Sequence, residues 1–86
     1  MFYYVYVLRC KKLGKFYVGF TKNLKRRLKQ HKKGDVHSTK RLGNCKLIFY
    51  EAYKNKKDAQ RRERYLKTTK GKRVLKRMLK EFLNQS

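Results

Sequence analysis

Residues 16–34 read FYVGFTKNLKRRLKQHKKG and contain two distinct patterns. Apolar and small side chains fill the stretch as far as Phe20, which predicts a β-strand. Side chains alternate between the two faces of a strand, so Tyr17 and Gly19 are expected on one face, with the other aromatic and aliphatic side chains on the opposite face. A glycine beside a tyrosine leaves a gap that a phosphate, or the water shell of a metal ion, could enter.

The second pattern within these residues predicts a helix. Thr21 or Asn23 can cap its first turn, and Gly34 is suited to ending it just after Lys33. Four side chains fall at helical spacing along a single stripe, namely Leu24, Arg27, Leu28 and His31. The strand and the helix therefore bring a tyrosine, an arginine and a histidine toward one place.

The remaining elements follow from similar patterns. Strands are expected at 2–9 and 46–53, a hairpin loop with Gly14 in a positive-φ conformation at 11–15, a polar loop at 34–44, and helices at 57–67 and 71–83. Their order is ββαβαα. The expected fold class is α+β, a small three-stranded antiparallel sheet flanked by helices, and residues 1–86 are expected to form a single domain.

Charge is the strongest feature of the composition. The chain has 27 Lys and Arg against five Asp and Glu, a formal net charge of +22 on 86 residues. Such an excess opposes compaction and is typical of proteins whose partner is a polyanion. Nucleic acid is the expected partner, and a ribosome-like RNA binder is the plain alternative. No membrane partner is expected, because the basic residues do not form one tail and the apolar N-terminal run is too short to span a bilayer.

Cysteine usage excludes several classes of site. Cys10 and Cys45 are too few and too far apart in sequence for a zinc site or a disulfide framework. We expect both to stay reduced in a cytoplasmic protein.

Carboxylates matter because a metal-dependent reaction on phosphate needs at least one, and Mg²⁺ commonly uses only one or two. Glu63 lies four residues after Ala59 and three before Leu66, on the apolar stripe of its helix. A buried acid needs a partner. The partner is either a metal ion or an arginine such as Arg27, and Glu51 is the second candidate ligand.

Arg27 could either extend outward from its stripe or point into a polar pocket, where its planar donors would suit a phosphate. His31 could hydrogen-bond a phosphate or move a proton, although a histidine at a helix end is more often simply exposed. Tyr6 is expected to stand near Tyr17 on the paired strand. Arg27, a metal and the positive field would favour a phenolate, whereas the alternative for either tyrosine is ordinary packing.

These residues match a known family. The chain resembles the GIY-YIG nuclease superfamily, in particular its small stand-alone bacterial members, over nearly its whole length. Tyr4-Val5-Tyr6 stands where the first motif falls, with Tyr4 in place of its glycine, and Tyr17-Val18-Gly19 matches the second. The segment from Tyr17 to Arg27 then resembles the strand-to-helix signature of the family.

The resemblance implies hydrolysis of phosphodiester bonds with one divalent metal, Mg²⁺ or Mn²⁺. Glu63 would hold the metal, Arg27 would bind the scissile phosphate, and a tyrosine, Tyr6 or Tyr17, would assist deprotonation of the attacking water. His31 matches a histidine common in small members. Residues expected to bind or position nucleic acid are Gly19, Arg26, His37, Ser38 and Lys40.

The sequence therefore predicts a GIY-YIG endonuclease acting on DNA, rather than RNA, in a branched, damaged or single-stranded form. Repair of DNA is the kind of process in which such an enzyme acts. Because no second domain is expected, either sequence preference is weak or a protein partner supplies specificity. The alternative function is a nucleic-acid-binding module that keeps the fold without catalysis.

Overall fold

A computed structural model describes the backbone of residues 1–85, and the side chains of these residues except Leu13, His37 and Ser38. Its elements are β1 (Tyr3–Cys10), η1 (Lys12–Gly14), β2 (Phe16–Thr21), α1 (Leu24–Lys32), α2 (His37–Lys40), β3 (Cys45–Tyr53), α3 (Lys56–Leu66), α4 (Thr69–Met78) and α5 (Lys80–Asn84). The strands form one antiparallel sheet in the order β2-β1-β3, so the fold class predicted from the sequence is confirmed.

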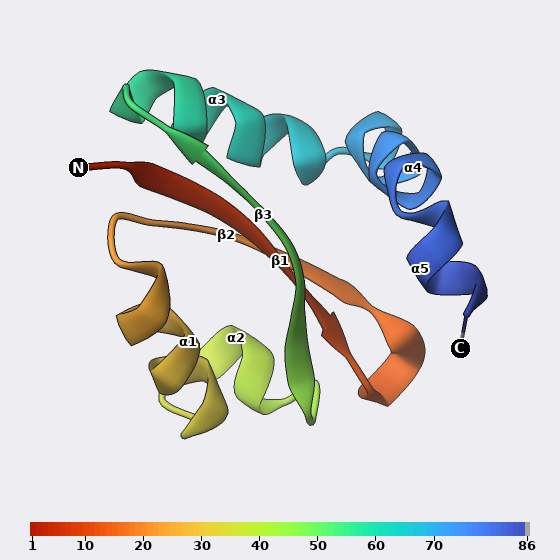
Figure 1. Ribbon diagram of the computed structural model, residues 1–86. Coiled ribbons are helices and arrows are strands. Elements are labelled where there is room, and N and C mark those ends of the chain that lie inside the picture. Colours follow the sequence, from red (N-terminus) through yellow and green to blue (C-terminus); the bar gives the residue numbers. More distant parts are fainter. Residues whose placement is uncertain (86) are drawn as a thin grey trace.

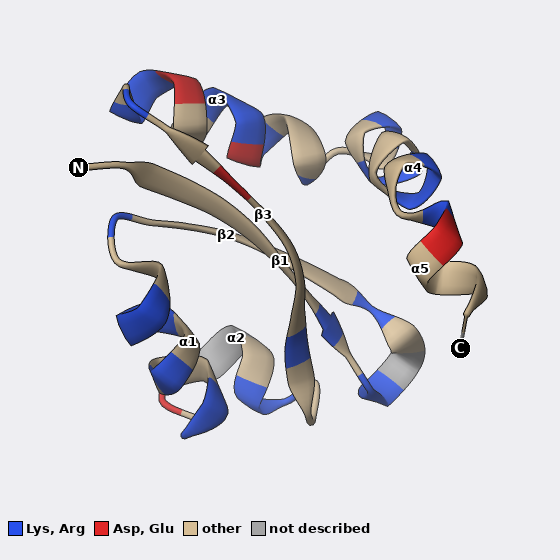
Figure 2. Cartoon of the chain, in the orientation of Figure 1, with Lys and Arg blue, Asp and Glu red and all other residues tan. Residues whose placement is uncertain are grey.

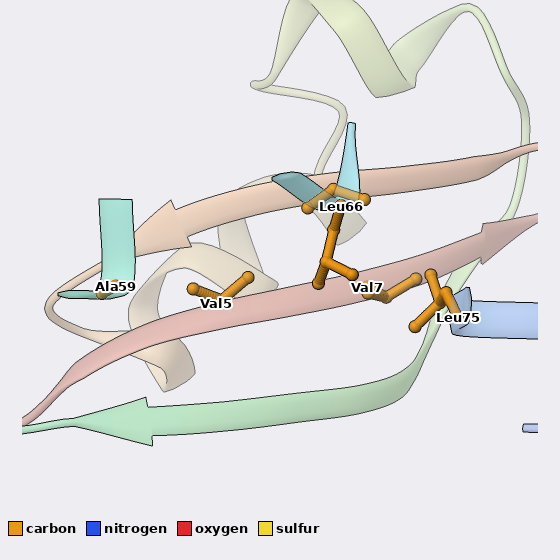
Figure 3. Close-up of a cluster of buried hydrophobic side chains, with 6 residues drawn as sticks. Val5, Val7, Ala59, Leu66 and Leu75 are labelled. Carbon is orange, nitrogen blue, oxygen red and sulfur yellow. The ribbon is translucent and has the colours of Figure 1, made fainter. Parts of the chain in front are cut away.

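Helices cover the sheet from both sides (Figure 1). The short pair α1 and α2 lies on one side, and α3, α4 and α5 lie on the other. The main core forms between the sheet and α3 and α4, from Val5, Val7, Ala59, Leu66 and Leu75 together with Val18 (Figure 3). A smaller cluster of Tyr6, Leu8 and Cys10 faces α1.

Local signals explain where the helices begin. The Asn23 side chain accepts a hydrogen bond from the Arg26 backbone N–H at the start of α1, as expected. Gly34 has a φ of 77° just beyond the end of α1, which is the conformation expected of a glycine in that place. Gly14 likewise has a φ of 58° in the turn between β1 and β2.

Three expectations were wrong in detail. The polar loop at 34–44 contains the short helix α2, and the helix expected at 71–83 begins earlier, at Thr69, because Thr68 caps it. That helix is also divided. Leu79 leaves the helical conformation, at φ −106° and ψ 18°, and packs against the main core between α4 and α5. A continuous apolar stripe does not reveal such a break.

Cys10 and Cys45 face each other across β1 and β3 and form a disulfide. The expectation of two reduced cysteines was therefore wrong. The residues are 35 positions apart in sequence, and only the pairing of the two strands brings them together. None of the helices in the described part of the chain is long and apolar enough to cross a membrane.

Candidate active site

Tyr6 lies at the centre of the site, in the middle strand of the sheet. Its side chain is completely buried, and Gly19 of β2 is its partner in the β1–β2 register. A β-carbon at position 19 would overlap Cζ and Oη of Tyr6. The gap predicted beside Tyr17 is therefore filled by the Tyr6 ring and is not open to a phosphate or to hydrated metal. The absence of a side chain at Gly19 gives the Tyr6 ring the space that it occupies.

A chain of hydrogen bonds runs through the Tyr6 hydroxyl. Arg27 Nε lies 3.4 Å from Tyr6 Oη, and Tyr6 Oη lies 2.8 Å from His31 Nε2. On its other side the His31 ring lies 2.7 Å from Thr39 Oγ1, through Nδ1, and the Thr39 hydroxyl donates to the Val36 carbonyl over 3.3 Å. Buried and partly buried polar groups of β1, α1 and α2 are thus paired with one another.

The direction of these bonds is assigned from the contacts of Thr39. With the Thr39 hydroxyl donating to the Val36 carbonyl, its oxygen accepts from His31, which assigns the histidine proton to Nδ1. His31 Nε2 is then the acceptor for the Tyr6 hydroxyl, whose oxygen in turn accepts from Arg27. The chain can pass a proton from Tyr6 to His31 while Arg27 stabilises the negative oxygen left behind.

Burial is the largest cause of the pKa shifts of Tyr6 and His31. It raises the pKa of Tyr6 to about 12, although the hydrogen bond from Arg27 opposes that change. Arg27 lowers the pKa of Tyr6, as expected, but burial outweighs this effect. Burial, and secondarily the Arg27 charge, lowers the pKa of His31 below its ordinary value, so the imidazole is neutral at pH 7.

Tyr17 completes the cluster on the α1 side of the sheet, on the face predicted for it. Its ring lies 5.2 Å from the His31 ring, edge to face, and 6.3 Å from the Tyr6 ring. Hydrogen bonding from Arg27 to the Tyr6 hydroxyl, and less strongly to Tyr17, raises the pKa of Arg27. The structure therefore brings Tyr6, Tyr17, Arg27 and His31 together, and Arg27 points inward.

Glu63 lies on α3, which packs on the other side of the sheet (Figure 1). Its side chain is 20% exposed, and its carboxylate Oε2 lies 3.0 Å from Nζ of Lys67, one helical turn further on. The ion-pair partner of Glu63 is thus a lysine and not an arginine, the alternative to a metal that the sequence suggested. The Glu63 charge is the smallest of the contributions to the raised pKa of Tyr6.

Glu51, the second candidate metal ligand, already accepts hydrogen bonds from two neighbouring side chains. Its Oε1 accepts from Arg62 Nε over 2.9 Å and from the Tyr53 hydroxyl over 2.7 Å. Among the described side chains, no group of three or more Asp, Glu, His or Cys comes together as a metal site. A site with Glu63 as its single carboxylate, completed by water and phosphate, is of a kind that Mg²⁺ accepts.

The surface residues expected to meet nucleic acid lie beside the cluster. Arg26 is exposed on α1, where it lines an open hollow of about 460 Å³ with Lys25, Lys29 and Lys33. Lys40 is exposed at the end of α2. The side chains of His37 and Ser38, expected to take part as well, lie outside the described residues.

Comparison with known proteins decides the family. A family model described as the GIY-YIG catalytic domain matches residues 2–78. This chain belongs to the GIY-YIG family. In the sheet, the two motifs that define GIY-YIG proteins lie side by side, with Tyr6 opposite Gly19 and Tyr4 opposite Thr21.

Individual relatives agree with this family. A UPF0213 protein of Clostridium perfringens is 43% identical over 65 residues, covering 74% of this chain and 69% of the relative. A UPF0213 protein of Staphylococcus saprophyticus is 31% identical over 75 residues, covering 86% and 90%. The solution NMR structure of a UPF0213 protein from Bacillus halodurans is similar with a TM-score of 0.58 and 33% identity, covering 91% of this chain and 85% of that one. These names describe no activity.

Two residues of the site were not found from the sequence. Thr39 is 2% exposed and fixes the His31 ring, and Gln30 accepts a hydrogen bond of 3.0 Å from Arg27 Nη1. Gln30 could have been noticed from its position one turn from Arg27. Thr39 carries no such signal, because it stands in a polar stretch and becomes buried only when α2 folds against α1.

Proposed function

We propose that this protein is a metal-dependent endonuclease that hydrolyses phosphodiester bonds in DNA. The GIY-YIG family is a family of nucleases, and the match extends over most of the chain. The observation that carries the proposal is the continuous chain Arg27–Tyr6–His31, in which a cation, a buried hydroxyl and a neutral imidazole are aligned. Packing alone does not require such an alignment.

The charge distribution supports a polyanionic substrate. Lys and Arg occupy helices on both sides of the sheet, whereas the five acidic residues are scattered (Figure 2). Contacts between such a surface and phosphates release counterions and give affinity without reading sequence. DNA affinity is thus supplied by the surface, and chemistry by the cluster around Tyr6.

Hydrolysis requires a water molecule to attack phosphorus, lose a proton and displace one ester oxygen. In our proposal Arg27 binds a non-bridging oxygen of the scissile phosphate. The proton of the water passes through the Tyr6 hydroxyl to His31 Nε2, with Thr39 holding the imidazole in the required tautomer, and the imidazolium then gives a proton to the displaced ester oxygen. Because Tyr6 is buried, substrate binding has to open a path from the water to its hydroxyl. Tyr17 packs against the His31 ring.

Glu63 would hold the divalent metal, Mg²⁺ or Mn²⁺. When bound, such an ion would neutralise charge on the phosphate and lower the pKa of water. Lys67 would exchange its contact with Glu63 for solvent, which costs little because the Lys67 side chain is 54% exposed.

A second function is a nucleic-acid-binding module without catalysis, and one observation favours it. Glu63 already has a lysine partner, and among the described residues no group of three or more His, Cys, Asp or Glu could hold a metal ion. The two functions differ in a single experiment, which is cleavage of DNA with Mg²⁺, Mn²⁺ or chelator by the natural protein and by Glu63→Ala. The endonuclease loses cleavage but keeps DNA binding in the variant, whereas the binding module never cleaves.

A further inference from the structure

Part of the sheet face beside α1 is left uncovered. Tyr50 of β3 is the register partner of the buried Tyr6, and partners in a sheet share a face. Tyr4, two residues before Tyr6, lies on this face too. Tyr6 is fully buried under α1, whereas Tyr50 is 52% exposed. We call Tyr4 and Tyr50 the tyrosine platform.

The two rings of the tyrosine platform form one surface. Their centroids are 6.1 Å apart, at an interplanar angle of 61°. Ala52, the partner of Tyr4 in β3, is also exposed. The platform thus continues the sheet face outward from the catalytic cluster to the edge strand β3 (Figure 1).

A hollow of about 370 Å³ extends the surface along β3. It is lined by Leu28, His31 and Lys32 of α1 and, in β3, by Lys46 and Leu47. Leu47 is 36% exposed and stands opposite Leu8, on the same face as Tyr50. Lys22, which directly follows the residue paired with Tyr4, is exposed at the other end of the platform. Apolar and aromatic surface is therefore bounded by cations.

We propose that the tyrosine platform stacks an unpaired base of the nucleic acid, next to the phosphate held by Arg27. This inference rests on the proposed function and names its substrate class, a strand that is single or locally splayed at the cleavage site. Exposed aromatic rings bounded by basic residues fit bases and phosphates together. A duplex hides the faces of its bases, so this platform would contribute nothing to binding a fully paired site.

Charge argues for this occupant over a protein. A partner that covered Tyr50 and Leu47 would also have to meet Lys32 and Lys46, on a chain with a net charge of +22. A nucleic acid can stack its bases on the tyrosine rings and place its phosphates against the lysines at the same time. A second copy of this chain would bring like charges together.

The test compares equilibrium binding of a single-stranded oligonucleotide and of a duplex of the same sequence, by fluorescence anisotropy in chelator at near-physiological salt. Tyr50→Ala should weaken single-strand binding by about 5- to 100-fold and leave duplex binding within about twofold. Tyr50→Phe should bind like the natural protein, and Tyr50→Leu should behave like Tyr50→Ala. Phe82→Ala is the matched control, because Phe82 is 43% exposed on α5 and lies on the other side of the sheet.

Equal losses on both ligands, or none on either, would overturn the proposal, as would a change in oligomeric state in light scattering with unchanged single-strand affinity. A measurement on the natural protein covers the case in which Tyr50→Ala fails to fold. The fluorescence of 2-aminopurine, placed in turn at each position of the single strand, should be quenched at one or two positions, and the absence of quenching contradicts stacking. Because these measurements need no turnover, they distinguish failure of the platform from failure of the endonuclease.

Discussion

The Tyr6 hydroxyl and His31 Nε2 are 2.8 Å apart, and both side chains are buried. The phenol donates, since the histidine proton is held on the far side of the ring by Thr39. A neutral base, the His31 imidazole, and a weak acid, the Tyr6 phenol, are therefore in direct contact in the folded protein. Arg27, the third member, donates to the same phenol oxygen, and its positive charge opposes the rise in the pKa of Tyr6.

Acid should weaken the fold through His31. Burial lowers the pKa of His31 in the folded state below its ordinary value of 6.5, so the unfolded chain binds its proton first as the pH falls. The contribution of His31 is complete above pH 6.5 and is lost as the pH falls from there through the folded pKa. Urea unfolding between pH 7.5 and 5 measures it. In His31→Gln this part of the pH dependence should disappear, and an unchanged profile would contradict the assignment.

Gly19→Ala should disrupt the site from the neighbouring strand. The added methyl group would overlap the Tyr6 ring, which has no room to withdraw because it is fully buried. We expect a loss of about 1–3 kcal/mol in the free energy of unfolding, a magnitude typical of overpacked cores. Thermal unfolding by circular dichroism provides the measurement. A variant as stable as the natural protein would show that Tyr6 is not seated on Gly19.

The Cys10–Cys45 disulfide should stabilise the protein by reducing the conformational entropy of the unfolded chain. Closing a loop across 35 residues is worth about 2–4 kcal/mol. Dithiothreitol should therefore lower the stability of the natural protein by that amount and leave the double variant Cys10→Ala/Cys45→Ala unaffected. If reductant changes neither protein, and a thiol assay finds two free thiols without it, the pair is not bonded in solution.

DNA binding should fall steeply with salt, because each contacted phosphate releases counterions. The logarithm of the binding constant should decrease linearly with the logarithm of salt concentration, and Arg26→Ala should reduce the slope by about one. Lys72→Ala is the control, since Lys72 is exposed on α4, away from α1. A slope near zero for the natural protein would contradict electrostatic binding. Equal changes of slope in both variants would contradict a specific contact between Arg26 and a DNA phosphate.

Local signals in the sequence were sufficient for most of the fold. Alternation located β2, and the Asn23 cap and Gly34 located α1, because these features act within a few residues. Long-range effects were not accessible. The burial of Thr39 and the pairing of Cys10 with Cys45 arise only when segments far apart in the chain meet.

The candidate site was predicted unevenly for the same reason. Sequence spacing placed Arg27 and His31 on one stripe, and strand alternation and pairing placed Tyr17 and Tyr6 near them; all four meet in the structure. Spacing also placed Glu63 on the inward side of α3, but it could not show that Lys67 would be its partner. The prediction of an open gap beside Gly19 was wrong, because the Tyr6 side chain of the neighbouring strand β1 fills the space that a glycine leaves.

Metal-dependent DNA cleavage by variants of the Glu63–Lys67 ion pair tests the central claim most directly. Glu63→Gln and Lys67→Met each break this pair, so a purely structural pair predicts the same modest effect from both. Our account predicts that the natural protein and Lys67→Met cleave single-stranded or plasmid DNA with Mg²⁺ or Mn²⁺ and not with chelator, whereas Glu63→Gln binds DNA without cleaving it. Equal cleavage by both variants, or binding without cleavage by the natural protein, would contradict it.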